Sequence, residues 1–312
     1  MIVIAFEKNI LLGGLGDRII GIISCKLIAN LLKRDFYILW NKENIKEYLN
    51  YSKYDYELKK VKSKDVKIYK YIDKQKGLKK YLMNNTKLFG NEVNKFYLNQ
   101  EISQYLYKNK LFKNRDYLKD IIGLYKELYS DILKPTDKII SIVNNLLAPY
   151  NVSNDVKKSN NIVGIQIRAG DKYMITNKGE RYTRITDPNT KIKNIIIKIK
   201  SHCDKIYNDY FVFVTSDYPN IYNIFSQIWD PCKLIYLNNI IQHLDRKSVN
   251  NNISKVFVDS YILSQKTDTL YISKYSNFGR VAALSATHNN IFDLNTNPIK
   301  IKQLLSKHEM LF

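Results

Sequence analysis

The stretch from Asn161 to Tyr173 combines residue types that could bind an anion. Its apolar, β-branched residues between Ile162 and Ile167 predict a short strand that is buried on both faces. The strand ends at Arg168, and Ala169-Gly170-Asp171 predicts a tight turn. Open α/β sheets bind ligands beyond the carboxyl ends of their strands, and a guanidinium there can hold a phosphate through two parallel hydrogen bonds. A strand that merely ends in a solvated arginine is the alternative, and this stretch alone does not decide between the two.

A second candidate anion site lies at Ser273–Leu284, where a strand is expected to end and a helix to begin. Ser276 has the side chain of a helix N-cap, and the backbone N–H groups that follow it, together with the helix dipole, can bind an anion. Capping alone would also explain this serine. The residues expected to contribute are Ser276, Asn277, Phe278, Gly279 and Arg280, the last of which could reach back to a phosphate or face solvent.

Glycines mark a third candidate near the amino terminus, where Gly14 and Gly16 precede a long apolar segment. We expect a strand at Ile2–Phe6, a helix at Ile19–Leu32 and a second strand at Phe36–Trp40, which together form a βαβ unit. Its glycine-rich turn could bring backbone N–H groups close to an anion or a sugar. A dinucleotide fingerprint would need a third glycine where the chain has Ile19, which disfavours a nicotinamide cofactor.

Strands and helices alternate through the second half of the chain, which predicts a parallel, doubly wound sheet. The expected strands are Ile162–Arg168, Tyr210–Thr215, Leu234–Leu237, Thr269–Ile272 and Ile291–Leu294. The expected helices are Asn189–Asp204, one from about Asn220, Val256–Gln265, Ser276–Ala286 and Pro298–Leu311. Before them, residues 41–110 predict loops, short helices and a strand or two, residues 117–133 and 137–147 predict helices, and residues 150–161 predict an interdomain linker.

Composition bounds the function without fixing it. The 312 residues are enough for two domains, and 50 basic against 29 acidic residues give a net charge of +21. Such a charge attracts nucleic acid, anionic membranes or phosphorylated ligands, but the lysines share A/T-rich codons with the abundant Asn, Ile and Tyr, so the charge alone decides nothing. The sequence has no apolar run long enough to span a membrane and no signal-peptide pattern. Cys25, Cys203 and Cys232 follow no metal-binding pattern, which indicates reduced thiols and a cytoplasmic protein.

Three segments in the same order resemble motifs of the fucosyltransferase superfamily, which comprises the α1,2-, α1,6- and protein O-fucosyltransferases and the nodulation enzyme. Gly13–Arg18 is similar to the glycine-rich first loop of these enzymes, and Gly164–Lys172 resembles their His-Val-Arg-Arg-x-Asp motif. Asp259–Leu284 resembles their last conserved block, and Thr215-Ser216-Asp217 resembles a strand end of the Thr-Asp-Asp type. The resemblance covers most of residues 160–295 and the first loop, and leaves residues 41–160 unmatched.

This resemblance implies an α/β fold of the GT-B type, with two Rossmann-like domains facing a cleft. Residues 1–155 would form the acceptor-side domain, residues 156–295 the nucleotide-sugar domain, and residues 296–312 a terminal helix. The implied reaction is an inverting, metal-independent transfer of fucose from GDP-fucose, with no cofactor, to a hydroxyl of a glycan or glycoprotein. Arg168 would contact the donor diphosphate and Ser276 a phosphate. Asp259 would lie on the nucleotide side and could read guanine, whose N1–H and N2–H₂ donors pair with a carboxylate.

Two departures from the family pattern leave the catalytic base open. Gln166 stands where the family has histidine, and Ala169 where many members have a second arginine. The position of a candidate base in the core-fucosylating enzymes is Thr176 here. Asp171 and Glu180 are the carboxylates nearest in sequence to the Arg168 turn. We favour Glu180 as the base, and the alternative is that neither carboxylate acts.

Three alternatives remain at this point. One is a GT-B transferase that uses a different nucleotide sugar. Another is a basic nucleic-acid-binding protein, whose binding would weaken steeply with salt and would ignore Arg168→Ala. The third is an inactive, lectin-like or structural descendant of the enzymes.

Overall fold

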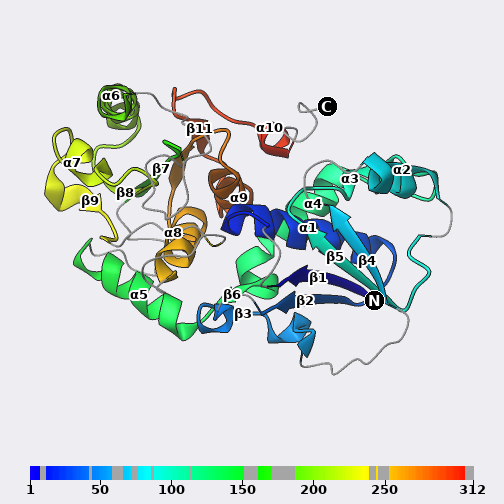
Figure 1. The fold of residues 1–312 in the computed structure, drawn as a ribbon. Coiled ribbons are helices and arrows are strands. Elements are labelled where there is room, and N and C mark those ends of the chain that lie inside the picture. The colour runs from blue at the N-terminus through cyan, green and yellow to red at the C-terminus, as the bar shows by residue number, and fades with distance from the viewer. Residues whose placement is uncertain are drawn as a thin grey trace. The chain divides into compact units, whose positions relative to one another are not determined.

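The structure is a computed structural model, and it describes residues 1–7, 12–41, 44–57, 66–71, 76–85, 88–112, 114–150, 161–170, 187–238, 244 and 253–305. The chain divides into two compact units, each built on its own parallel sheet (Figure 1). The first unit contains Met1–Thr136 and the second contains Asp137–Leu305. The sequence-based boundary at residue 155 falls between described segments, and the domain roles attached to it stay predictions.

The first unit contains a four-stranded parallel sheet in the order β2-β1-β5-β4. Its strands are β1 (Ile2–Phe6), β2 (Phe36–Trp40), β4 (Val66–Tyr71) and β5 (Val93–Leu98), and β3 (Leu49–Asn50) pairs separately with β6 (Lys134–Pro135). Its α-helices are α1 (Leu15–Leu31), α2 (Lys76–Asn84), α3 (Gln104–Tyr107) and α4 (Tyr117–Lys126), and a π-helical segment spans Leu128–Ile132.

The βαβ unit predicted at the amino terminus is present, with both strands at the predicted residues. Helix α1 begins at Leu15, four residues before the predicted start, because the glycine-rich segment already supplies its first turn. The other two strands of the sheet, β4 and β5, lie in the segment where we expected loops, short helices and a strand or two, without assigned bounds. Their aromatic and aliphatic residues are interleaved with lysines, which hides the period-2 pattern of a half-buried strand.

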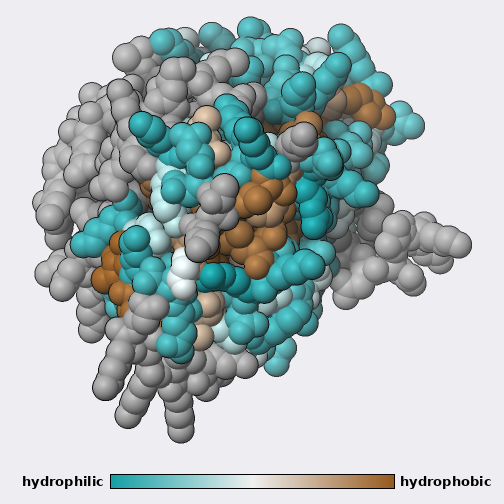
Figure 2. All heavy atoms as spheres, turned by 90° about the vertical axis from the view of Figure 1, so that its right-hand side faces the viewer, coloured by the Kyte–Doolittle hydropathy of each residue, from teal (hydrophilic) through white to brown (hydrophobic). Residues whose placement is uncertain are grey.

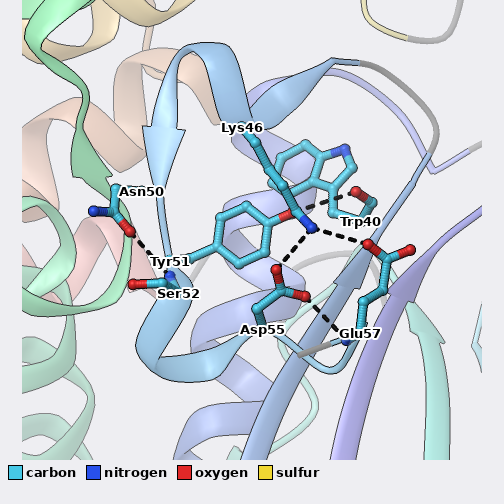
Figure 3. A network of polar contacts seen from close by, with 7 residues as sticks. All are labelled: Trp40, Lys46, Asn50, Tyr51, Ser52, Asp55 and Glu57. Atoms are coloured by element: carbon cyan, nitrogen blue, oxygen red, sulfur yellow. Dashed lines mark hydrogen bonds and ion pairs between the residues drawn. The ribbon is translucent and has the colours of Figure 1, made fainter. Parts of the chain in front are cut away.

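A network of polar contacts fastens the segment that follows β2 (Figure 3). The ammonium group of Lys46 lies 2.7 Å from a carboxylate oxygen of Asp55 and 2.9 Å from one of Glu57. The Tyr51 hydroxyl donates to the carbonyl oxygen of Trp40, the last residue of β2, at 3.3 Å. These contacts hold residues 44–57 beside the carboxyl end of β2.

Strand β4 forms an edge of the first sheet, and its aliphatic side chains are exposed. Val66 is 43% and Ile68 53% exposed, and the face of the molecule on this side carries hydrophobic side chains among hydrophilic ones (Figure 2). Lys67 and Lys70 are exposed on the same strand. Charged side chains on an edge strand oppose pairing with another chain.

The second unit contains a five-stranded sheet in the order β11-β10-β7-β8-β9, and all of its neighbouring strands are parallel. Its strands are β7 (Asn161–Ile167), β8 (Tyr210–Ser216), β9 (Leu234–Ile235), β10 (Thr269–Ile272) and β11 (Ile291–Asp293). Its α-helices are α5 (Asp137–Leu147), α6 (Pro188–Ile206), α7 (Ile221–Phe225), α8 (Ser254–Gln265), α9 (Asn277–Ser285) and α10 (Ile301–Leu305). The predicted parallel, doubly wound sheet is therefore confirmed.

The apolar residues of β7 explain why the sheet is covered on both faces. Val163, Ile165 and Ile167 join the core cluster that also holds the buried isoleucines of α6. On the other face, Gly164 lies under Leu263 of α8. The predicted elements of this half match those observed to within a few residues, except that α10 is described only over Ile301–Leu305. The linker was expected at residues 150–161. Its ends are described, Tyr150 in a short 3-10 helix and Asn161 as the first residue of β7, and residues 151–160 lie outside the described residues.

Candidate active site

The order of the second sheet reverses at β7, which is the first strand of the unit along the chain and lies between β10 and β8. In doubly wound sheets, ligands bind beyond the carboxyl ends of the strands at this topological switch point. Arg168 directly follows β7, and Ser273 directly follows β10. The backbone N–H of Arg168 donates to the Ser273 hydroxyl oxygen at 2.7 Å, so the two strand ends are joined at this point.

Asp217, the residue after β8, fixes the Arg168 turn. One carboxylate oxygen of Asp217 lies 3.0 Å from Nη1 of Arg168, and the carboxylate also accepts hydrogen bonds from the backbone N–H groups of Ala169 (2.5 Å) and Gly170 (2.9 Å). Burial raises the pKa of Asp217, while the guanidinium of Arg168 and the two N–H groups act in the opposite direction. The Arg168 side chain is partly exposed and the Asp217 side chain is buried, so Arg168 can meet a ligand from a fixed position.

The amino terminus of α9 lies next to this turn. Ser276 is the N-cap, as the sequence predicts, and its hydroxyl accepts the backbone N–H of Gly279 at 3.4 Å. Asn277 and Phe278 are partly exposed, whereas Ser276 and Gly279 are buried. A Cβ atom on Gly279 would lie only 2.4 Å from Oε1 of Gln166, so this glycine permits the close approach of α9 to β7. The Gln166 side chain thus packs against the first turn of α9.

Arg280 is directed toward α10. Its Nε donates to the carbonyl oxygen of Leu304 at 2.8 Å, its Nη2 contacts the same oxygen, and its Nη1 donates to the side chain of Asn277 at 2.9 Å. Arg280 is also buried, with 3% of its surface exposed. These contacts give Arg280 a role in joining α9 to α10, and they favour neither of the two orientations expected from the sequence, toward a phosphate or toward solvent.

Asp259 belongs to a buried polar cluster near the carboxyl end of β8. Its carboxylate accepts a hydrogen bond from the Thr215 hydroxyl at 2.6 Å and lies 2.9 Å from the ammonium of Lys255, four residues earlier in α8. The same ammonium lies 5.1 Å from the ring centroid of Tyr236. Burial raises the pKa of Asp259, while Lys255 and Thr215 favour the charged form. A ligand that binds Asp259 would have to approach a carboxylate that already contacts Thr215 and Lys255.

In the first unit, the glycine-rich turn is held by the first residues of α1. Gly13 has φ 84°, and the backbone N–H of Gly14 donates to a carboxylate oxygen of Asp17 at 2.9 Å. Arg18 is fully buried, lies 5.4 Å from the Trp40 ring centroid, and donates from Nε to the Gly13 carbonyl at 3.3 Å. Gly16 is buried inside the first turn of the helix. The expected ligand contacts of Gly14 and Gly16 stay predictions.

The structure brings together Arg168, Ser276 and the residues that follow Ser276 in α9, although the two segments are more than a hundred residues apart in sequence. Asp171, Thr176 and Glu180 lie outside the described residues, so the predicted bases stay predictions. Asp217, Ser273 and Lys255 were not predicted as site residues. Asp217 and Ser273 each directly follow a predicted strand, which is the signal that could have found them.

The sequence matches no protein-family model and no curated protein. Solved structures, in contrast, match over nearly the whole chain. A mutant of Arabidopsis thaliana FUT1 in complex with GDP matches with a TM-score of 0.60 and 14% identity, over 94% of this chain and 70% of that chain. The fucosyltransferase NodZ from Bradyrhizobium matches with a TM-score of 0.57 and 11% identity, over 94% of this chain and 95% of that chain. POFUT1 in complex with GDP matches with a TM-score of 0.52 and 11% identity, over 93% of this chain and 96% of that chain.

The chain has the fold of the fucosyltransferases. The fucosyltransferase resemblance and the α/β GT-B architecture predicted from the sequence are confirmed at the level of the fold. Among the described residues, no group of three or more His, Cys, Asp and Glu side chains is arranged to hold a metal ion. None of the helices described combines the length and apolar character of a membrane span.

Proposed function

We propose that this protein is a glycosyltransferase that moves fucose from GDP-fucose to a hydroxyl group of a glycan or glycoprotein acceptor. The observation that carries the proposal is the hydrogen bond from the Arg168 backbone to Ser273, three residues before the N-cap of α9, at the topological switch point of the second sheet. A guanidinium and a capped helix terminus at this place suit a diphosphate. The fucosyltransferase fold, with relatives that were solved with GDP, supports the same ligand.

The proposed reaction is a direct displacement at C1 of the sugar, which inverts the anomeric configuration. The acceptor hydroxyl oxygen bonds to C1 and gives up its proton to a base, for which Glu180 and Asp171 are the proposed candidates. At the same time the bond from C1 to the β-phosphate oxygen breaks, and its electron pair leaves on GDP. Arg168, held by Asp217, and the N–H groups at the α9 terminus would stabilise the charge that develops on the diphosphate. These groups supply positive charge without a metal ion, so the proposal includes activity in EDTA.

Asp259 is proposed to contact the guanine base, as the sequence resemblance implies. The carboxylate is buried beside Lys255 and Thr215, so the base would have to enter this cluster. A carboxylate accepts from N1–H and N2–H₂ of guanine, whereas adenine has no such pair of donors at these positions. The three cysteines, which are free of disulfides, fit a protein of a reducing compartment such as the cytoplasm.

Calorimetric titration with GDP, GDP-fucose, UDP and ADP in EDTA tests the proposal on wild type and Arg168→Ala. Arg115→Ala removes the same charge from an exposed position in the first unit and serves as the matched control. We expect GDP and GDP-fucose to bind wild type and Arg115→Ala alike, and Arg168→Ala to lose at least a hundredfold in affinity.

Two other results would change the proposal. Selective binding of UDP or ADP would retain a nucleotide-sugar transferase and discard fucose as the donor sugar. Absence of nucleotide binding by a well-folded wild type would overturn the proposal altogether.

A further inference from the structure

A tight turn joins β10 to α9 at the carboxyl edge of the second sheet. The backbone N–H of Ser276 donates to the carbonyl oxygen of Ser273 at 2.8 Å, which closes a four-residue turn. The central residues of this turn, Lys274 and Tyr275, are exposed. Lys274 took no part in the sequence-based site, although it directly precedes the exposed tyrosine before the N-cap.

Three hydrogen bonds fix this turn to β7 and to the residue that follows β7. The backbone N–H of Ser273 donates to the Gln166 backbone carbonyl oxygen at 3.0 Å and to Oε1 of Gln166 at 3.3 Å. The Ser273 hydroxyl oxygen accepts the backbone N–H of Arg168 at 2.7 Å. Lys274 is the next residue, and its flexible four-carbon stem brings the ammonium within reach of a ligand that Arg168 binds.

The charges at this edge of the sheet leave one cation unused. Five parallel strands end here, and the described residues that follow them are 168–170, 217–220, 236–238, 273–276 and 294–296. The charged residues among these are Arg168, Asp217 and Lys274. The guanidinium of Arg168 lies 3.0 Å from the Asp217 carboxylate, so these two charges largely cancel. Lys274 is therefore the remaining positive charge in this described set.

A nucleotide sugar needs such a charge. Each phosphate of the diphosphate is negative, and the β-phosphate gains a further charge when its bond to the sugar breaks. The N–H groups at the start of α9 supply partial positive charge, and Arg168 is already paired with a carboxylate. Within the part of the chain that the structure describes, the Lys274 ammonium makes no ion pair or hydrogen bond, so it can bind a phosphate oxygen without giving up another partner.

We propose that Lys274 is the second cation of the donor site and that its ammonium binds the β-phosphate of the nucleotide sugar. This inference rests on the proposed function and identifies a residue that selects a nucleoside diphosphate over a monophosphate. No proton moves to or from Lys274. The ammonium stays charged and offsets the charge on the β-phosphate oxygen as GDP departs.

Calorimetric titration with GDP and GMP in EDTA tests the inference on wild type, Lys274→Met and Lys274→Arg. Lys274→Met keeps an apolar stem and removes the charge, so we expect its affinity for GDP to fall about tenfold. Its affinity for GMP, which has no β-phosphate, should stay that of wild type. Lys274→Arg keeps a cation and should retain most of the affinity for GDP.

Lys198→Met is the matched control, because Lys198 is an exposed lysine of α6 and its loss lowers the net charge by the same amount. This variant should bind GDP as wild type does. Equal losses of GDP affinity in Lys198→Met and Lys274→Met would assign the effect to the overall charge of this basic chain and would overturn the inference. Urea denaturation should give all four proteins a similar free energy of unfolding, since both lysines are exposed.

Other results separate this inference from the proposed function. If wild type binds GDP more tightly than GMP and Lys274→Met keeps the whole difference, the inference is overturned while the proposed function stands. An equal loss of GDP and GMP affinity in Lys274→Met would also overturn it, because the ammonium would then not contact the β-phosphate. If wild type binds no GDP, the proposed function fails and the inference fails with it.

Discussion

The carboxylate of Asp217 lies 3.0 Å from the guanidinium of Arg168, and both residues directly follow neighbouring parallel strands. Asp217 also accepts the two backbone N–H groups of the turn after Arg168. Its buried charge is therefore satisfied from three sides, and the arginine has one preferred direction. The sheet therefore positions Arg168, because the residue that holds it follows the neighbouring strand directly.

The first prediction concerns this pair. Asp217→Asn removes the ion pair, so Arg168 loses its fixed direction, and we expect the affinity for GDP to fall about tenfold, which is about 1.4 kcal/mol. Because Asp217 acts through Arg168, Asp217→Asn should have little further effect in an Arg168→Ala background. A calorimetric double-mutant cycle measures this coupling. Tighter GDP binding by Asp217→Asn would instead mean that the carboxylate opposes the anion.

The second prediction compares two glycines that lie in helices. Gly279→Ala places a Cβ atom 2.4 Å from Oε1 of Gln166 and 3.1 Å from Cβ of Ile272, so we expect a loss of about 1–3 kcal/mol in stability and weaker GDP binding. A Cβ on Gly123 of α4 would meet nothing within 4 Å. Gly123→Ala should therefore stabilise the protein by about 0.5–1 kcal/mol, through helix propensity alone. Chemical denaturation of both variants measures the contrast, and equal effects would contradict the packing of α9 on Gln166.

The third prediction concerns the buried ion pair of α8. Among the described residues, Lys255→Met leaves the buried Asp259 carboxylate with Thr215 as its remaining partner, which we expect to cost about 3–5 kcal/mol. Lys255→Met combined with Asp259→Asn removes both charges and should recover most of that loss. Urea denaturation of wild type, both single variants and the double variant gives the coupling energy. Additive losses would show that the two side chains do not depend on each other in the folded protein.

Site residues at the end of a strand or the start of a helix could be predicted from the sequence, whereas contacts between distant segments could not. Arg168 and Ser276 could be predicted because each lies at the end of a strand or the start of a helix, and parallel strands bring such ends to one edge. The direction of the Arg280 side chain could not be predicted, because it depends on the position of the Leu304 carbonyl in α10. The pairing of β1 with β5 could not be predicted either, because it joins two strands that are far apart along the chain and β5 was not assigned from the sequence.

Glu101 provides a fourth prediction, on the pH dependence of stability. Its carboxyl group is buried, and Oε1 accepts hydrogen bonds from the Ser103 backbone N–H at 2.6 Å, the Ser103 hydroxyl and the Ser24 hydroxyl at 3.3 Å. Within the part of the chain that the structure describes, Oε2 has no hydrogen-bond partner. Burial raises the pKa of Glu101 from its ordinary 4.5 to about 7, against the effect of these hydrogen bonds.

The folded protein therefore holds a proton on Glu101 between pH 4.5 and about 7, where the unfolded chain has released it. Because the folded state binds more protons in this window, the contribution of Glu101 is fully present below pH 4.5 and is lost as the pH rises through about 7. The loss amounts to about 3 kcal/mol, at 1.36 kcal/mol for each pKa unit. Glu101→Gln carries no titrating group, so its free energy of unfolding, relative to wild type, should increase between pH 5 and pH 8. Urea denaturation across this range measures the difference, with the exposed Glu92→Gln as the control. A constant difference between Glu101→Gln and wild type would show that Glu101 is already charged in the folded protein.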